Sequence, residues 1–168
     1  RIFLSNLIGQ LEKQSVPKDR VPVVIATQLI PLLSHEIQHA VNAKHTGEIS
    51  TLEEEFSASV TQVVACRDVP RVYPEDYPYQ TDVSRYNEIM LRIWNTNGPE
   101  TLMKYVREDA YPDRVSIFSE EGKQRYEHDA ALYGPMIPIA KKILDNCSAF
   151  AGVAENTCIQ ETTKNEFQ

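Results

Sequence analysis

The sequence PLLSHEIQHAVNAKHTG occupies residues 31–47 and predicts the central helix of the chain. Apolar residues recur here at spacings of three and four, which is the period of an α-helix. The residues before His35 are apolar on nearly every side, so we expect this helix to be central rather than superficial. Pro31 predicts either a kink or the first turn of the helix, and Gly47 predicts its end. The periodic apolar positions are Ala26, Leu29, Ile30, Leu33, Ile37, Ala40 and Val41.

An H-E-x-x-H motif lies within this helix and is formed by His35, Glu36 and His39. One helical turn separates the two histidines, so both imidazoles can reach one metal ion. Glu36 is rotated by about 100° from His35, which places its carboxylate beside the metal without binding it. Zinc lowers the pKa of a bound water to about 7, so this carboxylate is an adequate base. The motif therefore predicts a zinc site with a third protein ligand and an open position for water, unless His39 and Glu36 face solvent and the spacing is accidental.

A second helix is predicted to begin near Ser50, because Ser50-Thr-Leu-Glu53 matches a capping box. The capping box accounts for Glu53, and Glu54 is expected to project into solvent. Glu55 is followed one turn later by Ala58, a small residue that leaves room for the first helix to approach. The apolar face of this helix ends before Asp68 and comprises Leu52, Phe56, Val60, Val63 and Val64.

Glu55 and His45 are the two candidates for the third zinc ligand. The acidic run that contains Glu55 has a second interpretation as a solvated helix start, which the helix dipole favours. His45 extends the first motif to H-E-x-x-H-x-x-N-x-x-H, in which the helix would have to break at Asn42. Asn tolerates the left-handed conformation better than most residues, so its presence does not exclude His45 as a ligand. His45 is alternatively a cation stabilised by the C-terminal end of the helix.

The H-E-x-x-H motif followed by Glu55-x-x-Ala58 resembles the gluzincins, the thermolysin-like zinc peptidases. In that family a Glu on the next helix, often within Glu-x-x-Ala, completes the metal site. The spacer of residues 40–54 is short, as in the compact minigluzincins. The resemblance covers about residues 2–64 and implies a zincin-like helical domain, with Ile2–Ser5 as its edge strand.

The resemblance further implies hydrolysis of peptide or protein substrates by a water that zinc activates. The general base deprotonates the attacking water and passes the proton to the leaving amine. Family members often use a downstream His or Tyr to stabilise the oxyanion, which indicates His128 or Tyr126. The other interpretation of His128 is a surface histidine on a charged helix. The residues expected in these roles are His35, His39 and Glu55 on zinc, Glu36 as the base, and His128 at the oxyanion.

Two other functions stay open. With His45 as third ligand the chain would be metzincin-like, although the one counterpart of the metzincin Met-turn, Gly134-Pro135-Met136, is distant from the motif. The chain could instead be a catalytically inactive zinc-containing module that binds a partner. A peptidase also needs a sheet edge that binds substrate, and Ile2–Ser5 is the single strand candidate.

The remaining sequence predicts a mainly α fold, assigned to the α+β class because of the small N-terminal strand region. Two helices are expected over Asp82–Asn95 and Pro99–Asp109, because Asn97-Gly98-Pro99 combines stop and start signals. The Tyr- and Pro-rich segment of residues 67–80 is expected to be irregular and to border the cleft. Helices are also expected over Glu120–Tyr133 and Pro138–Cys147.

One domain is expected over residues 1–168, because a chain of this length can bury a sizeable core. It would consist of a zinc-binding core at 1–66, a helical part at 67–150 and a loose tail at 151–168. The net charge of −7 and the absence of a basic run argue against nucleic-acid or anionic-membrane partners. The longest apolar stretch, Val21–Leu33, is too short to span a bilayer.

The cysteines leave the compartment open. Cys66 lies in an apolar run and is expected to be a buried thiol. Cys147 and Cys158 could pair in an exported protein or stay reduced in a cytosol. The chain starts at Arg1 rather than Met, so upstream sequence is a further possibility. The sequence does not indicate an oligomeric state.

Overall fold

The structure is a computed structural model that describes residues 4–46 and 51–126, together with residues 134, 137, 138, 140–142, 144 and 145. Of residues 44–46 it describes the backbone alone. The fold is mainly α, as predicted, and the described residues contain no strand. The elements are α1 (Leu4–Glu12), α2 (Val21–Thr46), α3 (Leu52–Val72), the 3₁₀ helix η1 (Pro74–Asp76), α4 (Asp82–Tyr105), the π-helix η2 (Val106–Ala110) and α5 (Glu120–Tyr126).

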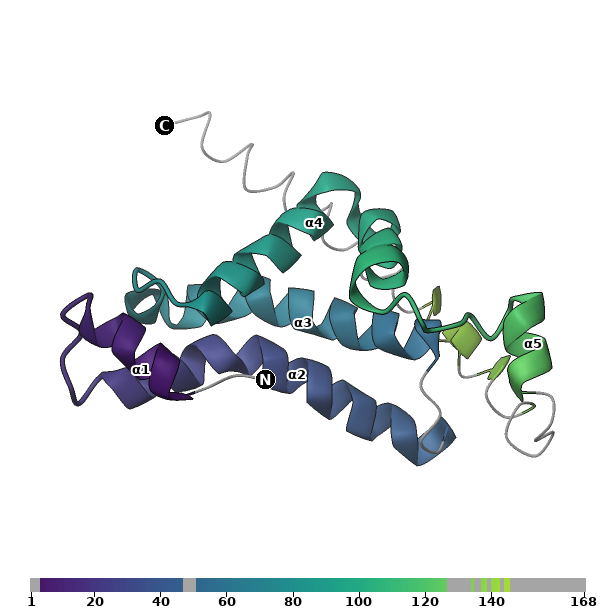
Figure 1. Cartoon of the computed structure of the whole chain (residues 1–168), viewed down its shortest axis with the longest axis horizontal. Helices are drawn as coiled ribbons and strands as arrows, with labels where there is room; N and C mark the ends of the chain where they lie inside the picture. The colour runs from purple at the N-terminus through teal and green to yellow at the C-terminus, as the bar shows by residue number, and fades with distance from the viewer. Residues whose placement is uncertain are drawn as a thin grey trace.

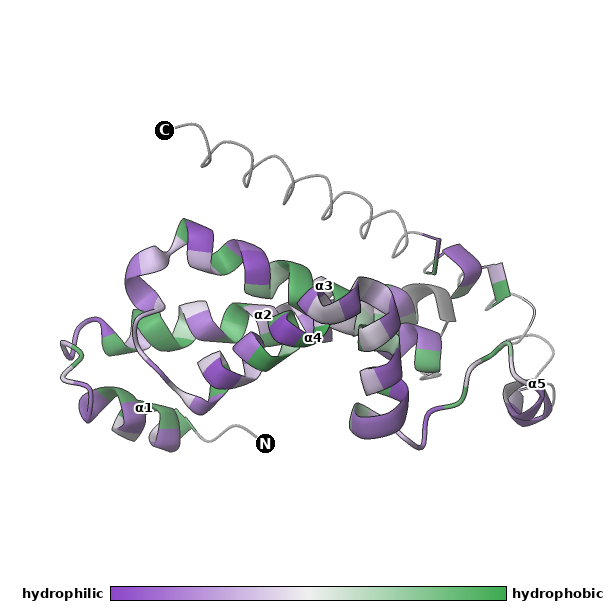
Figure 2. Cartoon of the chain, turned by 90° about the horizontal axis from the view of Figure 1, so that it is seen from above, coloured by the Kyte–Doolittle hydropathy of each residue, from purple (hydrophilic) through white to green (hydrophobic). Residues whose placement is uncertain are grey.

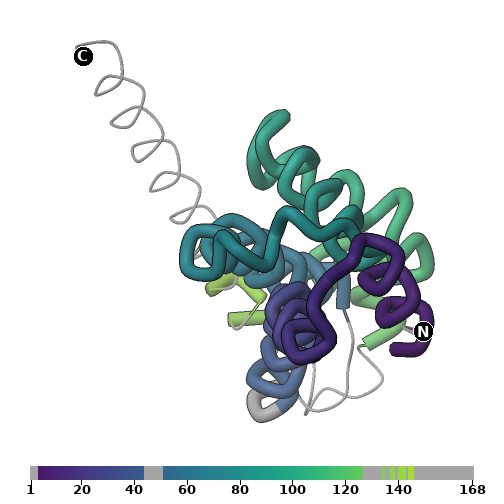
Figure 3. Tube along the Cα trace, turned by 90° about the vertical axis from the view of Figure 1, so that its left-hand side faces the viewer, coloured from purple at the N-terminus to yellow at the C-terminus, as the bar shows by residue number. Residues whose placement is uncertain are grey.

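The N-terminal region is helical from Leu4 onward, so the strand predicted over Ile2–Ser5 is wrong for the part that the structure describes. α1 continues through Gly9 to Glu12. Its buried side chains, Leu7 and Leu11, are spaced by one helical turn and pack beside the first turns of α2. Figure 3 shows this arrangement end on, with α1 in the darkest purple.

α2 and α3 are long antiparallel helices that lie side by side (Figure 1). α2 passes through Pro31 as one helix, so it does not begin there. Only one side of α2 is buried, which corrects the prediction of a central helix: Leu33 and Ile37 are 54% and 62% exposed. The buried side carries polar residues, among them Gln28, His35 and Asn42, as well as the apolar Val24 and Ile25.

The first two turns of α3 are buried on every side. Thr51 is the N-cap and its hydroxyl accepts a hydrogen bond from the Glu54 backbone N–H, at 3.2 Å. The capping box predicted for Glu53 is therefore wrong: its carboxylate accepts from the Ser116 hydroxyl and the Ile117 N–H, at 2.5 and 3.1 Å. α3 also continues through Pro70 to Val72, beyond the predicted end.

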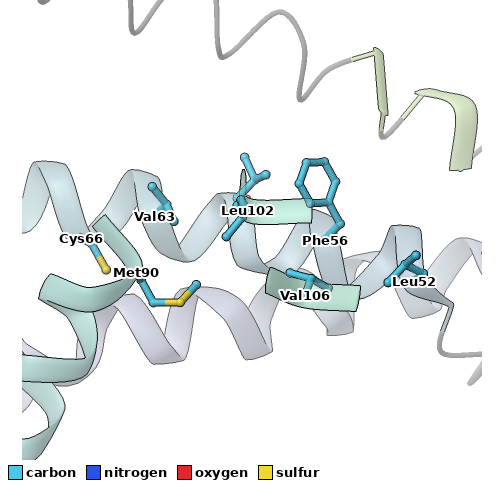
Figure 4. Close-up of a cluster of buried hydrophobic side chains, with 8 residues drawn as sticks. Leu52, Phe56, Val63, Cys66, Met90, Leu102 and Val106 are labelled. Atoms are coloured by element: carbon cyan, nitrogen blue, oxygen red, sulfur yellow. The ribbon is translucent and has the colours of Figure 1, made fainter. Parts of the chain in front are cut away.

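α4 packs across α3 and closes the main core. Figure 4 shows this cluster, to which α3 contributes Leu52, Phe56, Val63 and Cys66, α4 contributes Met90 and Leu102, and η2 contributes Val106. α4 bends at Asn97 and Gly98, whose dihedral angles are not helical, so the predicted boundary between two helices is confirmed. Gly98 has φ of 55°, the left-handed conformation that favours glycine. The bend lets both halves of α4 reach the same core.

A segment of residues 111–117, which we call the strap, follows η2 and crosses the start of α3. The Leu52 N–H donates to the Val115 carbonyl at 3.2 Å, so the strap satisfies a first-turn donor of α3. α5 follows the strap at the far end of the molecule (Figure 1). Figure 2 shows that hydrophobic and hydrophilic residues alternate along the helices, and none of the helices described is long and apolar enough to cross a membrane.

Candidate metal centre

Three predicted ligand atoms converge between α2 and α3. His35 and His39 lie one turn apart on α2, and their Nε2 atoms are 3.0 Å from each other. The Glu55 Oε2 atom, from the first turn of α3, lies 3.3 Å from the His39 Nε2 and 3.9 Å from the His35 Nε2. Ligand atoms about 2.0 Å from a tetrahedral zinc ion are about 3.3 Å apart, so the donor set and its spacing fit zinc. These residues form the candidate metal centre of the described part of the chain.

The antiparallel pairing of α2 and α3 produces this convergence. α2 ends at Thr46 and α3 begins at Leu52, so the end of one helix faces the start of the next. Ala58, one turn after Glu55, is fully buried and adds little bulk between the helices. The prediction that a small residue here admits the first helix therefore agrees with the packing.

The two histidines differ in charge. Burial and the neighbouring His39 lower the pKa of His35, which favours the neutral imidazole that binds a metal. Hydrogen bonds that the protonated His39 ring donates to the Glu54 and Glu55 carboxylates raise the pKa of His39 to about 10. Without a bound cation, the positive charge of protonated His39 offsets negative charge on these two carboxylates. A divalent cation would supply the same compensation at the same place.

Glu54 is a site residue that the sequence reasoning missed. It is 7% exposed rather than solvent-facing, and its Oε1 lies 3.3 Å from the His39 Nδ1. A carboxylate on the second nitrogen of a metal-binding histidine orients the ring and increases its basicity. The prediction was wrong because α2 and the strap cover the whole first turn of α3. The one signal for Glu54 in the sequence was its position directly before Glu55, a proposed ligand.

Glu36 is exposed, on a different side of α2 from the buried His35. Its negative charge raises the pKa of both His35 and Tyr111, so its carboxylate lies within electrostatic reach of both. It is not among the converging ligand atoms. This position is compatible with the predicted base, which stands beside the metal without binding it.

The strap adds two side chains that were not predicted. The Tyr111 hydroxyl lies 3.3 Å from the His35 Nε2, and the two rings are stacked with centroids 6.4 Å apart. Burial, with the charges of Glu55 and Glu36, raises the pKa of Tyr111 to about 12. The Arg114 Nε donates to the Glu55 Oε1 at 3.3 Å. Both residues are more than 50 positions from their partners, so no local pattern in the sequence could have indicated them.

The alternative ligand His45 lies in the last turn of α2, and its side chain is outside the described part of the structure. The helix break that a metzincin-like site would need at Asn42 is absent, because α2 continues to Thr46. The Asn42 side chain is buried and accepts from the Gln38 amide at 2.8 Å.

Several predicted features fall outside the described residues. They are His128, Gly47, Ser50, Cys147, Cys158, the Met-turn candidate at 135–136 and the tail at 151–168. Tyr126, the other oxyanion candidate, lies at the end of α5 and packs against a small cluster with Ile117 and Ala140. Cys66 is a free, buried thiol as predicted, and burial raises its pKa to about 12.

The Tyr- and Pro-rich segment lies away from the metal centre, which corrects the expectation that it borders the cleft. Asp76 and Tyr79 are hydrogen-bonded to Arg20, Thr27 and Gln28, near the start of α2. Thr27 precedes the first histidine by eight residues, or about 12 Å of helix. Residues 67–72 also belong to α3 rather than to an irregular segment.

Comparisons of the chain with models of protein families, with curated proteins and with solved structures found no match. The resemblance to the gluzincins therefore remains a prediction that depends on the motif. The geometry of the site is the observation from which its function can be argued.

Proposed function

We propose that the chain is a zinc-dependent peptidase in which His35, His39 and Glu55 hold the metal. One observation carries this proposal: two imidazole nitrogens and one carboxylate oxygen, from two different helices, converge at the spacing of tetrahedral zinc ligands. Three protein ligands leave the fourth position open, which is the arrangement of catalytic rather than structural zinc.

Zinc, when bound, would lower the pKa of a water and polarise a substrate carbonyl. Glu36 would accept the proton of the attacking water and return it to the leaving amine. The Tyr111 hydroxyl, whose pKa of about 12 keeps its proton in place at neutral pH, would donate a hydrogen bond to the developing oxyanion. Glu54 would hold the His39 ring in its ligating orientation.

A zinc-containing binding module without catalytic activity is the second candidate. It is favoured by the lack of a strand in residues 4–46 and 51–126, because an exposed strand edge is a common way to hold an extended peptide. Cleavage separates the two candidates, since both require the metal.

The test measures the metal content of the purified chain and the cleavage of a panel of unstructured proteins, with and without a chelator. The wild-type chain is expected to hold one zinc ion and to lose cleavage on chelation. Glu36→Gln is expected to retain zinc and to cleave about 10²- to 10⁴-fold more slowly, because it removes the base but none of the ligands.

Glu108→Gln is the matched control, because Glu108 lies on η2 and pairs only with exposed cations among the described residues. It is expected to match the wild type in zinc content and rate. Absence of bound zinc, or cleavage that survives chelation, would contradict the proposal. Bound zinc without any cleavage would favour the binding module.

A further inference from the structure

The strap supplies partners for buried carboxylates at the start of α3. Ser116 and the Ile117 N–H bind Glu53, and Arg114 binds Glu55. Buried carboxylates without such partners would be costly, so the strap and the first turn of α3 stabilise each other. The strap therefore reaches the metal centre through Glu55 as well as through Tyr111.

The two oxygens of Glu55 face different groups. Oε1 accepts from the Arg114 Nε at 3.3 Å, and Oε2 lies 3.3 Å from the His39 Nε2. The Glu55 side chain is almost fully buried, whereas the Arg114 side chain is 43% exposed. The guanidinium thus approaches Glu55 from the solvent side, and the histidines approach it from α2.

The backbone around Arg114 is anchored on both sides. The Arg114 N–H donates to the Tyr111 carbonyl at 3.0 Å. The Tyr111 N–H in turn donates to the Val106 carbonyl at 2.9 Å, which caps the C-terminal end of η2. On the other side, Ser116 is bound to Glu53. A donor that is presented by a fixed turn loses little freedom when it pairs, so it can define where a carboxylate oxygen lies.

We propose that Arg114 is a positioning residue that restricts Glu55 to one oxygen on the metal. A carboxylate that is free to rotate can bind zinc through both oxygens, and the second oxygen would occupy the position that water needs. By holding Oε1, Arg114 keeps that position open. This inference depends on the proposed zinc site but not on catalysis.

The test loads the full chain with cobalt in place of zinc and compares wild type with Arg114→Ala. The visible spectrum of cobalt reports its coordination number, because four-coordinate cobalt absorbs more strongly than five-coordinate cobalt. Wild type is expected to give the four-coordinate spectrum, and Arg114→Ala a weaker, five-coordinate one. Zinc affinity, measured by competition with a chromophoric chelator, is expected to fall about 10- to 100-fold in the variant.

Arg114→Lys provides a second variant that retains the charge. Its ammonium lacks the planar guanidinium donors, so it is expected to recover part of the zinc affinity and an intermediate spectrum. Arg107→Ala is the matched control, since Arg107 lies seven positions earlier and pairs with the exposed Glu108. It is expected to behave as the wild type. Circular dichroism of each variant verifies that it is folded.

The possible outcomes separate this inference from the proposed function. A folded Arg114→Ala chain with the spectrum and affinity of Arg107→Ala would overturn the role of Arg114 and leave the zinc site intact. If Arg114→Ala does not fold, a wild-type spectrum and affinity in Arg114→Lys would overturn it. A wild-type chain that binds neither cobalt nor zinc would overturn both the zinc site and the role of Arg114.

Discussion

Tyr111 brings a hydroxyl group to the metal centre, although it is not one of the predicted ligands. Its hydroxyl is 3.3 Å from the His35 Nε2, and its pKa of about 12 means that it stays protonated throughout the range in which a peptidase is assayed. We expect Tyr111→Phe to lower kcat about 10²- to 10³-fold, because loss of one preorganised oxyanion donor costs that much. Zinc content and KM are expected to change little. Steady-state kinetics on one cleaved peptide would measure this.

Tyr126→Phe is the control for this prediction. Tyr126 was the tyrosine that the sequence indicated for the oxyanion, yet it packs with Ile117 at the other end of the strap. Its variant is expected to keep the wild-type kcat. A Tyr111→Phe chain as fast as the Tyr126→Phe chain would remove Tyr111 from the proposed chemistry.

Spacing along the chain indicated the two histidines and left Glu55 and His45 as alternatives for the third ligand. His35 and His39 share one helix face by period alone, and Glu55 lies in the first turn of the next predicted helix. Glu54 and Tyr111 could not be indicated in this way, because their roles depend on tertiary packing. Tyr111 is 76 residues from His35, and the two side chains meet through the packing of the folded chain.

At the level of elements, α5 is packed against the strap at Gly122. The Ser119 hydroxyl accepts from the Gly122 N–H at 3.0 Å, and the Lys123 N–H donates to the Ser119 carbonyl at 2.9 Å. A Cβ at Gly122 would stand 1.9 Å from the Ser116 carbonyl oxygen. Because that neighbour is backbone, it cannot move aside without displacing the part of the strap that binds Glu53.

Gly122→Ala is therefore expected to destabilise the fold by about 1–3 kcal/mol, the usual cost of forcing an atom into a filled space. Gly9→Ala is the matched control, since Gly9 lies within α1 and a Cβ there meets nothing within 4 Å. It is expected to stabilise the chain by about 0.5–1 kcal/mol through reduced backbone entropy. Urea unfolding followed by circular dichroism would measure both. Equal stability in the two variants would contradict the packing of α5 on the strap.

The sequence predicted one internal boundary correctly and missed others. Asn97-Gly98-Pro99 separates two helical segments as expected, because glycine and proline act locally. Pro31 and Pro70 nevertheless lie inside helices. A proline removes one backbone N–H donor from its helix, and tertiary packing can outweigh that cost. The strand expected at Ile2–Ser5 was wrong from Leu4 onward, since contacts with α2 select the helical spacing of Leu7 and Leu11.

At the scale of the whole molecule, the apolar period of α2 identified a helix but not its buried side. Leu33, Ile37 and Val41 share one face, and all three are exposed. The opposite side is buried and includes residues that a hydropathy pattern discounts, such as Gln28 and His35. Polar residues therefore share the buried side of α2 with the apolar cluster of Val21, Val24 and Ile25, and the apolar period alone does not reveal them.

Gln28 and its neighbours hydrogen-bond the connection between α3 and α4 to α2. The Gln28 amide donates to the Tyr79 carbonyl at 2.8 Å, its oxygen accepts from the Thr81 hydroxyl at 2.6 Å, and its backbone carbonyl accepts from Asn87 at 2.9 Å. Asp76, fully buried, accepts from the Thr27 hydroxyl at 3.0 Å. The metal centre thus lies on a helix pair that this network holds in register at its other end.

Arg20 carries the charge that compensates this network, because its Nη2 lies 2.5 Å from the Asp76 Oδ1. Arg20→Ala would leave a buried carboxylate with one hydroxyl donor, so we expect it to destabilise the fold by about 2–3 kcal/mol. Arg85→Ala breaks an exposed pair with Asp82 and is expected to cost less than about 0.5 kcal/mol. Urea unfolding of the metal-free chains would compare the two. If Arg20→Ala were no more destabilising than Arg85→Ala, the Asp76 network would not be what holds α2 against the α3–α4 connection, and the orientation of the metal-binding face would need another cause.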